Sequence, residues 1–484
     1  MARVGLALTI AFGGLAAGAG YWQVVQAPPL SAAPDNPAVI AAARQVLRGP
    51  ILDREGTVLA SNERDRNNEP YRVYKDPVMS PVIGYASRLF GSAGIERAYE
   101  AQLTGLTRPD PVQDLLKKFE ADPTDPQALT LTISLKLQRA AVKALGRDRG
   151  AVVMLDPRSG EILALASNPI YDASEVANPS TSEKAFAELQ ALSARPLLSR
   201  ATQGRYVPGS IFKIVTAIAG LGSDAITPET TFPGQRRAER EGLVVSGFRI
   251  REHAGVPVRT FTLATATEVS SNIWFAMAGL ETGGEELADW AGRVGFGAAL
   301  PFDLPTAPSQ VTNGGGNFGG GFKDAVELAN AAYGQAETVV TPLQMALVAA
   351  IVANDGVLMK PRVVAKLEGA KSGARTTAPE ELRAILGGDD ARAIQVAMQQ
   401  AVEGELGRKF TPGAKVPGVP TAGKSGTAEL GGKGEPHSWF IGFAPVEDPQ
   451  VAIAVLVERG GRGGERAAPL AGDMMKLYLD SLGG

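Results

Sequence analysis

Two apolar hairpin patterns restrict the fold of this chain more than any other feature. The segment AVVMLDPRSGEILALAS (151–167) has two apolar runs separated by turn residues, and SWFIGFAPVEDPQVAIAVLVE (438–458) repeats that pattern near the carboxyl end. A β-rich run passes into a helical pattern over 129–145, and an apolar-faced helix is expected from about Ala468 to Leu482. Helical segments separate the hairpins. The pattern predicts an α+β fold, in which an antiparallel sheet is assembled from distant parts of the sequence and packed by helices.

Length and composition exclude several classes of protein. The 484 residues, 44% of them hydrophobic, are enough for two domains, one of them large. Because 48 Lys and Arg residues nearly balance 51 Asp and Glu residues, we expect no nucleic-acid partner. With no cysteine and only two histidines, the chain cannot use thiol catalysis, a disulfide framework or a multi-histidine metal site, so no metal is expected.

The amino-terminal segment has the composition of a membrane span. Residues 4–20 are almost wholly apolar or small, and Tyr21-Trp22 follow like an interfacial aromatic belt. Arg3 precedes this stretch and the next basic residue is Arg44. The positive-inside rule therefore places the bulk of the chain outside the cytoplasm.

We accordingly predict a single-pass protein of the cell membrane, with a cytoplasmic tail (1–3) and a transmembrane anchor (4–22). A cleaved signal peptide is the alternative, because Ala17-Gly18-Ala19 has the small-x-small form that a signal peptidase accepts. The Pro/Ala-rich segment that follows (23–40) is expected to be an extended linker.

A small domain and a large one are expected beyond the linker. Residues 41–128 mix a strand-like ILDREGTVLAS, which contains a Glu55-Gly56 turn, with helical patterns in PVIGYASRLFG and IERAYEAQL. We interpret this part as a small α/β pedestal domain. Residues 129–484, which include both hairpins, form the large domain of the prediction.

The segment YVPGSIFKIVTAIAGL holds the first pair of candidate catalytic residues. Pro208-Gly209 predict a sharp turn, and Ser210 begins an apolar-periodic helix with Lys213 one turn later. At this spacing the two Cβ atoms lie roughly 5–6 Å apart. A neutral lysine amine could then accept the serine proton as the hydroxyl attacks a carbonyl. In isolation such a pair is more often an N-capping serine followed by a solvated lysine.

Two further polar motifs fit the same chemistry. Ser270-Ser271-Asn272 interrupts an apolar helical run, and Ser270 could relay a proton while Asn272 binds a substrate amide or carbonyl. In Lys424-Ser425-Gly426-Thr427 the lysine could hold a substrate carboxylate, Gly426 would admit the substrate backbone, and the Thr427 N–H could point into the cleft. The same tripeptide at Lys371-Ser372-Gly373 lies in a polar stretch and is assigned to a surface loop.

The order SxxK, SxN and K[ST]G resembles the penicillin-interacting serine acyltransferases. The segments RGPILDREGTVLA (48–60) and GIERAYEAQLTG (94–105) are similar to the pedestal of class B penicillin-binding proteins, and YVPGSIFK, GQAETVVTPLQMA (334–346) and HSWFIGFAP are similar to their transpeptidase domain. The resemblance covers nearly the whole chain beyond the linker. It implies a penicillin-binding/β-lactamase-like transpeptidase domain after the pedestal.

The resemblance also implies a function for each motif. Ser210 is expected to be acylated by the penultimate D-Ala of a peptidoglycan stem peptide, with Lys213 as the base and with Ser270 and Asn272 completing the proton network. The 424–427 motif would bind the carboxylate, and the N–H groups of Ser210 and Thr427 would form the oxyanion hole. An amine of a second stem peptide would then resolve the ester, and β-lactams would trap Ser210. No cofactor is implied, and a SEDS-type glycan polymerase in the membrane is the implied partner.

Several alternatives stay open at this stage. A β-lactamase or D,D-carboxypeptidase could use the same fold, although the nearest candidate for a deacylation base, Glu327, lacks the class A spacing and is expected on a helix surface. A non-catalytic penicillin-binding sensor or scaffold is also possible. For a Ser-His-Asp hydrolase, His253 lies in an expected loop and His437 is expected to flank the cleft beside a strand. The Gly-rich segment 314–322 lacks the Gly-Lys-Ser/Thr ending of a phosphate loop and is expected to be a loop near the cleft.

Overall fold

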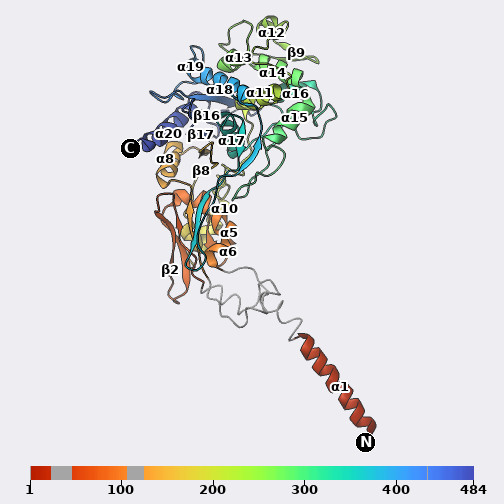
Figure 1. Cartoon of the computed structure of the whole chain (residues 1–484), viewed down its shortest axis with the longest axis vertical. Coiled ribbons are helices and arrows are strands. Elements are labelled where there is room, and N and C mark those ends of the chain that lie inside the picture. Colours follow the sequence, from red (N-terminus) through yellow and green to blue (C-terminus); the bar gives the residue numbers. More distant parts are fainter. Residues whose placement is uncertain (1, 23–45, 106–124, 433, 484) are drawn as a thin grey trace.

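The computed structural model describes residues 2–22, 46–105, 125–432 and 434–483. The larger part of the described chain is built around a five-stranded sheet, and a second, six-stranded sheet lies toward the amino-terminal side (Figure 1). The predicted linker, 23–40, lies outside the described residues.

The five-stranded sheet confirms both predicted hairpins. Its strand order is β15-β16-β17-β7-β8, and all neighbours are antiparallel. The sheet therefore joins strands from the two ends of the large domain. The strands are β7 (Gly150–Leu155), β8 (Ile162–Asn168), β15 (Ala422–Ala428), β16 (His437–Ala444) and β17 (Val451–Val457).

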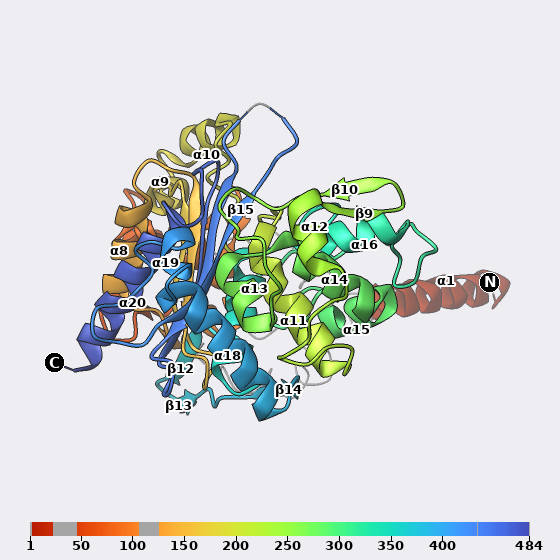
Figure 2. The same ribbon diagram turned by 90° about the horizontal axis from the view of Figure 1, so that it is seen from above.

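Helices cover both faces of this sheet (Figure 2). Alternate residues of one strand face opposite sides: Val152 and Met154 pack in one core with α8 (Leu135–Leu145) and α20 (Ala467–Leu482), whereas Val153 packs in the other with α17 (Pro342–Ala353). Because both faces are covered, residues that point to either side are buried, and the strand sequences are therefore apolar without alternation. The position of α20 agrees with the predicted carboxyl-terminal helix.

A helical region borders the face that carries α17. It includes α11 (Lys213–Gly222), α12 (Gln235–Glu241), α13 (Leu263–Val269), α14 (Asn272–Thr282), α15 (Gly284–Arg293), α16 (Ala325–Ala331), α18 (Gly388–Glu403) and α19 (Gly407–Phe410), with the short hairpin of β9 (Leu243–Val245) and β10 (Phe248–Ile250). A separate strand pair, β11 (Val357–Met359) and β14 (Glu381–Ala384), and two helices, α9 (Ala173–Ala177) and α10 (Ser182–Ala191), complete the large part.

The second sheet draws strands from both sides of the predicted 128/129 boundary. Its order is β13-β12-β6-β1-β2-β3, so strands from 364–376 extend a sheet that begins near residue 51. The boundary divides the sequence but not this sheet. The strands are β1 (Ile51–Leu52), β2 (Val58–Arg64), β3 (Pro70–Tyr74), β6 (Ala128–Leu131), β12 (Val364–Gly369) and β13 (Gly373–Thr376).

One helical expectation in the pedestal was wrong. In PVIGYASRLFG the helix α4 (Ser80–Ile83) ends at Gly84, and the chain turns into a small strand pair of β4 (Ala86–Ser87) and β5 (Gly91–Ser92). Gly84 has a φ of 73°, and a Cβ there would lie 2.1 Å from the Ala93 carbonyl oxygen. Close packing of the returning chain therefore ends the helix. The IERAYEAQL segment does form helices, α5 (Gly94–Ala98) and α6 (Glu100–Thr104).

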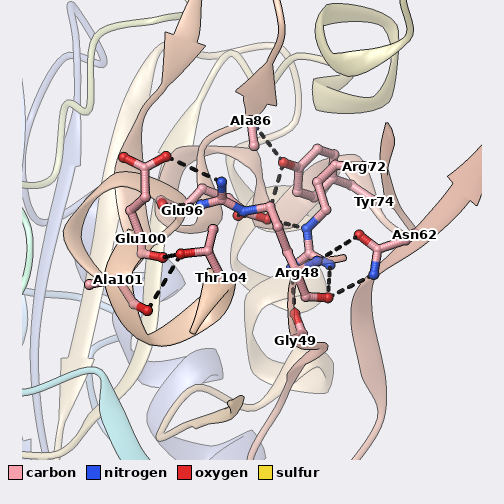
Figure 3. Close-up of polar contacts among 10 residues, drawn as sticks. All are labelled: Arg48, Gly49, Asn62, Arg72, Tyr74, Ala86, Glu96, Glu100, Ala101 and Thr104. Atoms are coloured by element: carbon pink, nitrogen blue, oxygen red, sulfur yellow. Dashed lines mark hydrogen bonds and ion pairs between the residues drawn. The ribbon is translucent and has the colours of Figure 1, made fainter. Parts of the chain in front are cut away.

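A buried ion-pair network holds the pedestal together (Figure 3). The Glu96 carboxylate accepts hydrogen bonds from Arg48 Nε and from Arg72 Nε, each at 2.7 Å, and from the Tyr74 hydroxyl at 3.2 Å. Arg72 also donates to the Gly49 carbonyl at 2.8 Å. The network joins the segment before β1, strand β3 and helix α5, so one carboxylate connects three separate parts of the pedestal.

Glu96→Ala is expected to destabilise the protein by about 3–5 kcal/mol, because it leaves the buried Arg72 guanidinium without its counter-charge and leaves Arg48 with only its pair to Glu100. Glu100→Ala is the matched control: this glutamate also pairs with Arg48, but its side chain is 54% exposed and the pair is worth less than about 1 kcal/mol. Denaturant unfolding measures both variants. Equal losses in the two variants would contradict the central role of Glu96.

The amino-terminal helix α1 (Ala2–Gly20) contains a window, Arg3–Gly20, that is long and apolar enough to cross a membrane. None of this window is buried against the rest of the described chain. A predominantly apolar helix that packs against none of the described protein surface fits the predicted single-pass anchor.

Candidate active site

Ser210 lies in a segment that is held tightly between two glycine contacts. The 3₁₀ turn Gly209–Phe212 leads directly into α11, and Gly209 has a φ of 57°. The Gly209 N–H donates to the Gly334 carbonyl at 2.9 Å, and a Cβ on Gly334 would lie only 1.9 Å from the Gly209 carbonyl oxygen. On the other side, a Cβ on Gly209 would lie 2.7 Å from the Thr427 carbonyl oxygen. Ser210 is therefore fixed against the edge of β15.

The structure gives Gly426 a different partner from the one expected. A Cβ at this position would lie 2.8 Å from the Pro208 carbonyl oxygen and 3.0 Å from Ile211 Cγ2. The space that the missing side chain leaves is thus occupied by the protein's own Ser210 segment. The sequence alone assigns this space to a substrate backbone. A glycine indicates that another group approaches closely, but the sequence does not show whether that group is a substrate or another part of the chain.

Lys213 is fully buried, and its amine is surrounded by oxygen atoms. Nζ donates to the Ser270 carbonyl at 2.6 Å, to Ser270 Oγ at 3.1 Å and to Asn272 Oδ1 at 2.9 Å, and it lies 5.6 Å from the centre of the Phe275 ring. Burial lowers the pKa of Lys213 to about 7, against the opposing effect of the Glu252 and Glu239 charges. A substantial fraction of this amine is therefore neutral near physiological pH.

Ser270 has the left-handed backbone conformation that orients these oxygens. Its φ and ψ are 58° and 40°, at the carboxyl end of α13. This conformation costs about 1–2 kcal/mol for a residue with a side chain. It turns the chain between α13 and α14 so that the carbonyl and hydroxyl of Ser270 both reach Lys213. The Asn272 amide is oriented from its other end, because Nδ2 donates to the Arg251 carbonyl at 3.3 Å.

The third motif lies on the edge strand β15, beside Ser210. Lys424 is 1% exposed, its Nζ donates to the Ser425 carbonyl at 2.9 Å, and burial followed by the Lys213 charge lowers its pKa. Ser425 Oγ lies 3.1 Å from Thr411 Oγ1. Because the Thr427 carbonyl faces Gly209, and the N–H and C=O of one strand residue point to the same side, the Thr427 N–H also faces the Ser210 segment.

These groups border one cavity of about 1030 Å³. Five of the predicted residues line it, and the two lysines lie behind its wall at 0% and 1% exposure. The structure thus brings together side chains from three sequence regions. The five lining residues are Ser210, Ser270, Asn272, Ser425 and Thr427.

Two acidic residues of the site were missed by the sequence analysis. Glu252 accepts hydrogen bonds from the N–H groups of Asn272 and Ile273 at 3.0 and 2.8 Å, and from Ser271 Oγ at 2.6 Å. Glu239, on α12, lies 3.2 Å from the same hydroxyl. No local pattern marks either residue, because their proximity to the second motif is created only by the fold.

The other residues considered from the sequence have clear positions. His253 is in a loop that lines the cavity. His437 begins β16, where it pairs with Ala428 and accepts a hydrogen bond from the Arg459 N–H at 3.1 Å, and it is not among the described residues that line the cavity. Lys371 and Ser372 lie in the exposed turn between β12 and β13, which confirms the surface assignment. The Gly-rich segment 314–322 is a loop that is exposed near Gly314 and Phe318 and ends in the fully buried Phe322.

The prediction that Glu327 is a surface carboxylate was wrong. Its side chain is in the cavity wall and the residue is 8% exposed. It accepts hydrogen bonds from Thr312 Oγ1 and from the Lys323 N–H, both at 2.7 Å. The loop between Val311 and Lys323 folds over α16 and covers this carboxylate, a long-range contact that helical periodicity does not report.

A metal site is not supported by the part of the chain that the structure describes. Within 2–22, 46–105, 125–432 and 434–483 there is no cluster of three or more His, Cys, Asp or Glu residues that could hold a metal ion.

Comparisons with known proteins match this geometry to one family. Residues 150–476 match the penicillin binding protein transpeptidase domain, and residues 48–126 match the penicillin binding protein A dimerisation domain. The chain is similar to the peptidoglycan D,D-transpeptidase PbpA of Mycolicibacterium smegmatis, with 34% identity over 97% of this chain and 96% of the relative, and to that of Mycobacterium tuberculosis, with 32% identity over 94% of each.

Solved structures agree with the sequence comparison. The M. tuberculosis penicillin-binding protein A in its penicillin G acyl-enzyme complex superposes with a TM-score of 0.77 at 32% identity, covering 90% of this chain and all of that one. A D,D-transpeptidase domain from Eggerthella lenta superposes with a TM-score of 0.76 at 31% identity, over 91% and 99% of the two chains. The chain therefore belongs to the penicillin-binding protein transpeptidase family.

Proposed function

We propose that this protein is a serine D,D-transpeptidase that cross-links peptidoglycan stem peptides and is acylated by β-lactams. The observation that supports this most strongly is the buried Lys213 amine, which contacts Ser270 and Asn272 beside Ser210 at one cavity. The relatives are named peptidoglycan D,D-transpeptidases, and one similar structure is a penicillin G acyl-enzyme.

In the first half-reaction Ser210 Oγ attacks the carbonyl carbon of the penultimate D-Ala, and its proton passes to the neutral Lys213 amine. The negative oxygen of the tetrahedral intermediate binds the N–H groups of Ser210 and Thr427. The proton then moves through the Ser270 hydroxyl to the nitrogen of the terminal D-Ala. The C–N bond breaks, free D-Ala leaves, and an ester remains on Ser210.

In the second half-reaction the amine of another stem peptide attacks this ester. Its proton returns through the same network to Ser210 as the ester bond breaks, and a new peptide bond is formed. The remaining polar groups hold the donor: Asn272 binds its peptide backbone, while Lys424, Ser425 and Thr427 bind its carboxylate. None of the described residues forms a hydrogen bond with Ser210 Oγ in this free enzyme, and such catalytic contacts commonly tighten only when substrate binds.

Incubation of the purified protein with a pentapeptide donor and an amine acceptor tests the proposal. We expect free D-Ala together with a cross-linked product of matching mass, and a labelled-penicillin adduct on Ser210 that persists for many minutes. Fast release of hydrolysed penicillin would instead identify a β-lactamase, D-Ala release without cross-linking would identify a carboxypeptidase, and an adduct without any turnover of donor would identify a sensor.

The exposed apolar helix α1 supports a cellular position for this reaction. We infer that it anchors the protein as a single membrane pass, with the tail 1–3 in the cytoplasm and the large domain on the extracytoplasmic side, where the cell wall is built. We further propose residues 41–128 as the pedestal and 129–484 as the transpeptidase domain. A SEDS-type glycan polymerase in the same membrane is the proposed partner, on the basis of the resemblance to the family.

A further inference from the structure

Two residues of the loop that follows β10, Glu252 and His253, contact the two ends of the turn between α13 and α14. Glu252 accepts three hydrogen bonds from the start of α14: from the N–H groups of Asn272 and Ile273 and from the Ser271 hydroxyl. A carboxylate at this end of a helix is also favoured by the unpaired N–H groups and the helix dipole. The first residues of α14 are therefore fixed by a side chain from another segment.

The next residue of the loop, His253, reaches the opposite side of the turn. Its Nε2 lies 3.0 Å from the carbonyl oxygen of Val269, the residue immediately before Ser270. The turn with the left-handed Ser270 is thus held at its start by His253 and at its end by Glu252. This turn presents the Ser270 and Asn272 oxygens to the Lys213 amine, so its position determines how that amine is bound.

The Glu252 carboxylate also interacts with several titratable groups. These groups are Lys213 on α11, Glu239 on α12, Tyr333 in the turn after α16, and the neighbouring His253. Burial and the Glu252 charge raise the pKa of Glu239 to about 8.

We propose that Glu252 is a positioning residue for acylation: it holds the Ser270–Asn272 turn in the place where the oxygens of Ser270 and Asn272 reach the Lys213 amine. This inference rests on the proposed function, because it concerns the lysine that accepts the serine proton. The Glu252 side chain contacts the turn and not the reacting serine, so it affects the reaction only through Lys213.

The rate of acylation by a fluorescent penicillin, measured from about pH 5 to about pH 9, tests the inference. In the parent the rate falls below a midpoint near the pKa of Lys213, because only the neutral amine accepts a proton. Glu252→Gln replaces one of the two accepting oxygens by an NH2 group, which cannot accept a hydrogen bond from the N–H of Asn272 or of Ile273. The turn then loses at least one of its hydrogen bonds, so the plateau rate falls by about tenfold, and the loss of the charge moves the midpoint down. Glu252→Asp keeps the charge but shortens the side chain, so the midpoint is retained and the plateau rate falls by about tenfold or more.

Glu241→Gln is the matched control. It removes a carboxylate from the same helix as Glu239, but that side chain is 48% exposed and pairs with Arg237 at the surface. Its pH profile is expected to coincide with that of the parent. Thermal unfolding of each variant shows that the proteins compared are folded.

Plateau rates equal to that of the parent in both Glu252→Gln and Glu252→Asp overturn the inference. If the parent is labelled and Ser210→Ala is not, the proposed function stands after such a result. If the parent itself forms no adduct, the proposed function fails first.

Discussion

Lys213→Arg is expected to reduce the rate of acylation by labelled penicillin by about 10³-fold, near the level of Ser210→Ala. The variant keeps a positive charge at the same place, but a guanidinium stays protonated throughout the accessible pH range and cannot accept the serine proton. In the parent, burial lowers the pKa of Lys213 to about 7, so the amine is already poised between its two states. The loss should therefore persist at high pH, where a merely weakened base would recover.

The control is Lys323→Arg. This lysine lines the same cavity, but its side chain is 54% exposed and its Nζ lies 3.7 Å from a Glu337 carboxylate oxygen at the surface. Its acylation rate should stay within a factor of about two of the parent, because exposed pairs of this kind contribute little. Normal labelling of Lys213→Arg would refute the lysine as the base, and the serine would then need another proton acceptor.

Gly334→Ala is expected to reduce the acylation rate by about 10²-fold or more, although Gly334 makes no contact with a bound substrate in the proposed mechanism. The added Cβ would lie 1.9 Å from the Gly209 carbonyl oxygen. The atom with which it clashes belongs to the backbone that carries Ser210. A backbone atom cannot rotate away as a side chain can, so the Ser210 segment must shift. A displacement of about 1 Å at the nucleophile is enough for a loss of this size.

Gly297→Ala is the control that separates the effect of displacing the Ser210 segment from the effect of backbone strain alone. Both glycines have a strongly positive φ, 84° for Gly297 and 87° for Gly334, but a Cβ at position 297 meets no atom within 4 Å. Gly297→Ala should lower stability by about 1–2 kcal/mol and leave acylation unchanged. Equal acylation rates in the two variants, measured on folded protein, would show that the Gly334 contact does not position Ser210.

Local patterns predicted the parts of the fold that depend on neighbouring residues. The hairpins β7-β8 and β16-β17 and the helix α20 were predicted because apolar runs, turn residues and helical periodicity lie within one short segment. Gly84 was not recognised as a helix end, because its role depends on a contact with Ala93 in a returning part of the chain. The strands β12 and β13 were likewise not assigned to the pedestal sheet, since pairing between distant strands leaves no local mark.

Residue types and spacings alone fix the chemistry that this protein has available: a serine and a lysine one turn apart, a serine with an asparagine two residues later, and a lysine with a glycine two residues later. Only the tertiary structure decided the state and position of those groups. Burial lowers the pKa of Lys213, Glu252 fixes the turn that binds it, and Gly209 and Gly334 pack closely against each other beside Ser210. These effects depend on solvent exclusion and on contacts between residues far apart in the chain, and neither quantity is encoded in the spacing of a motif.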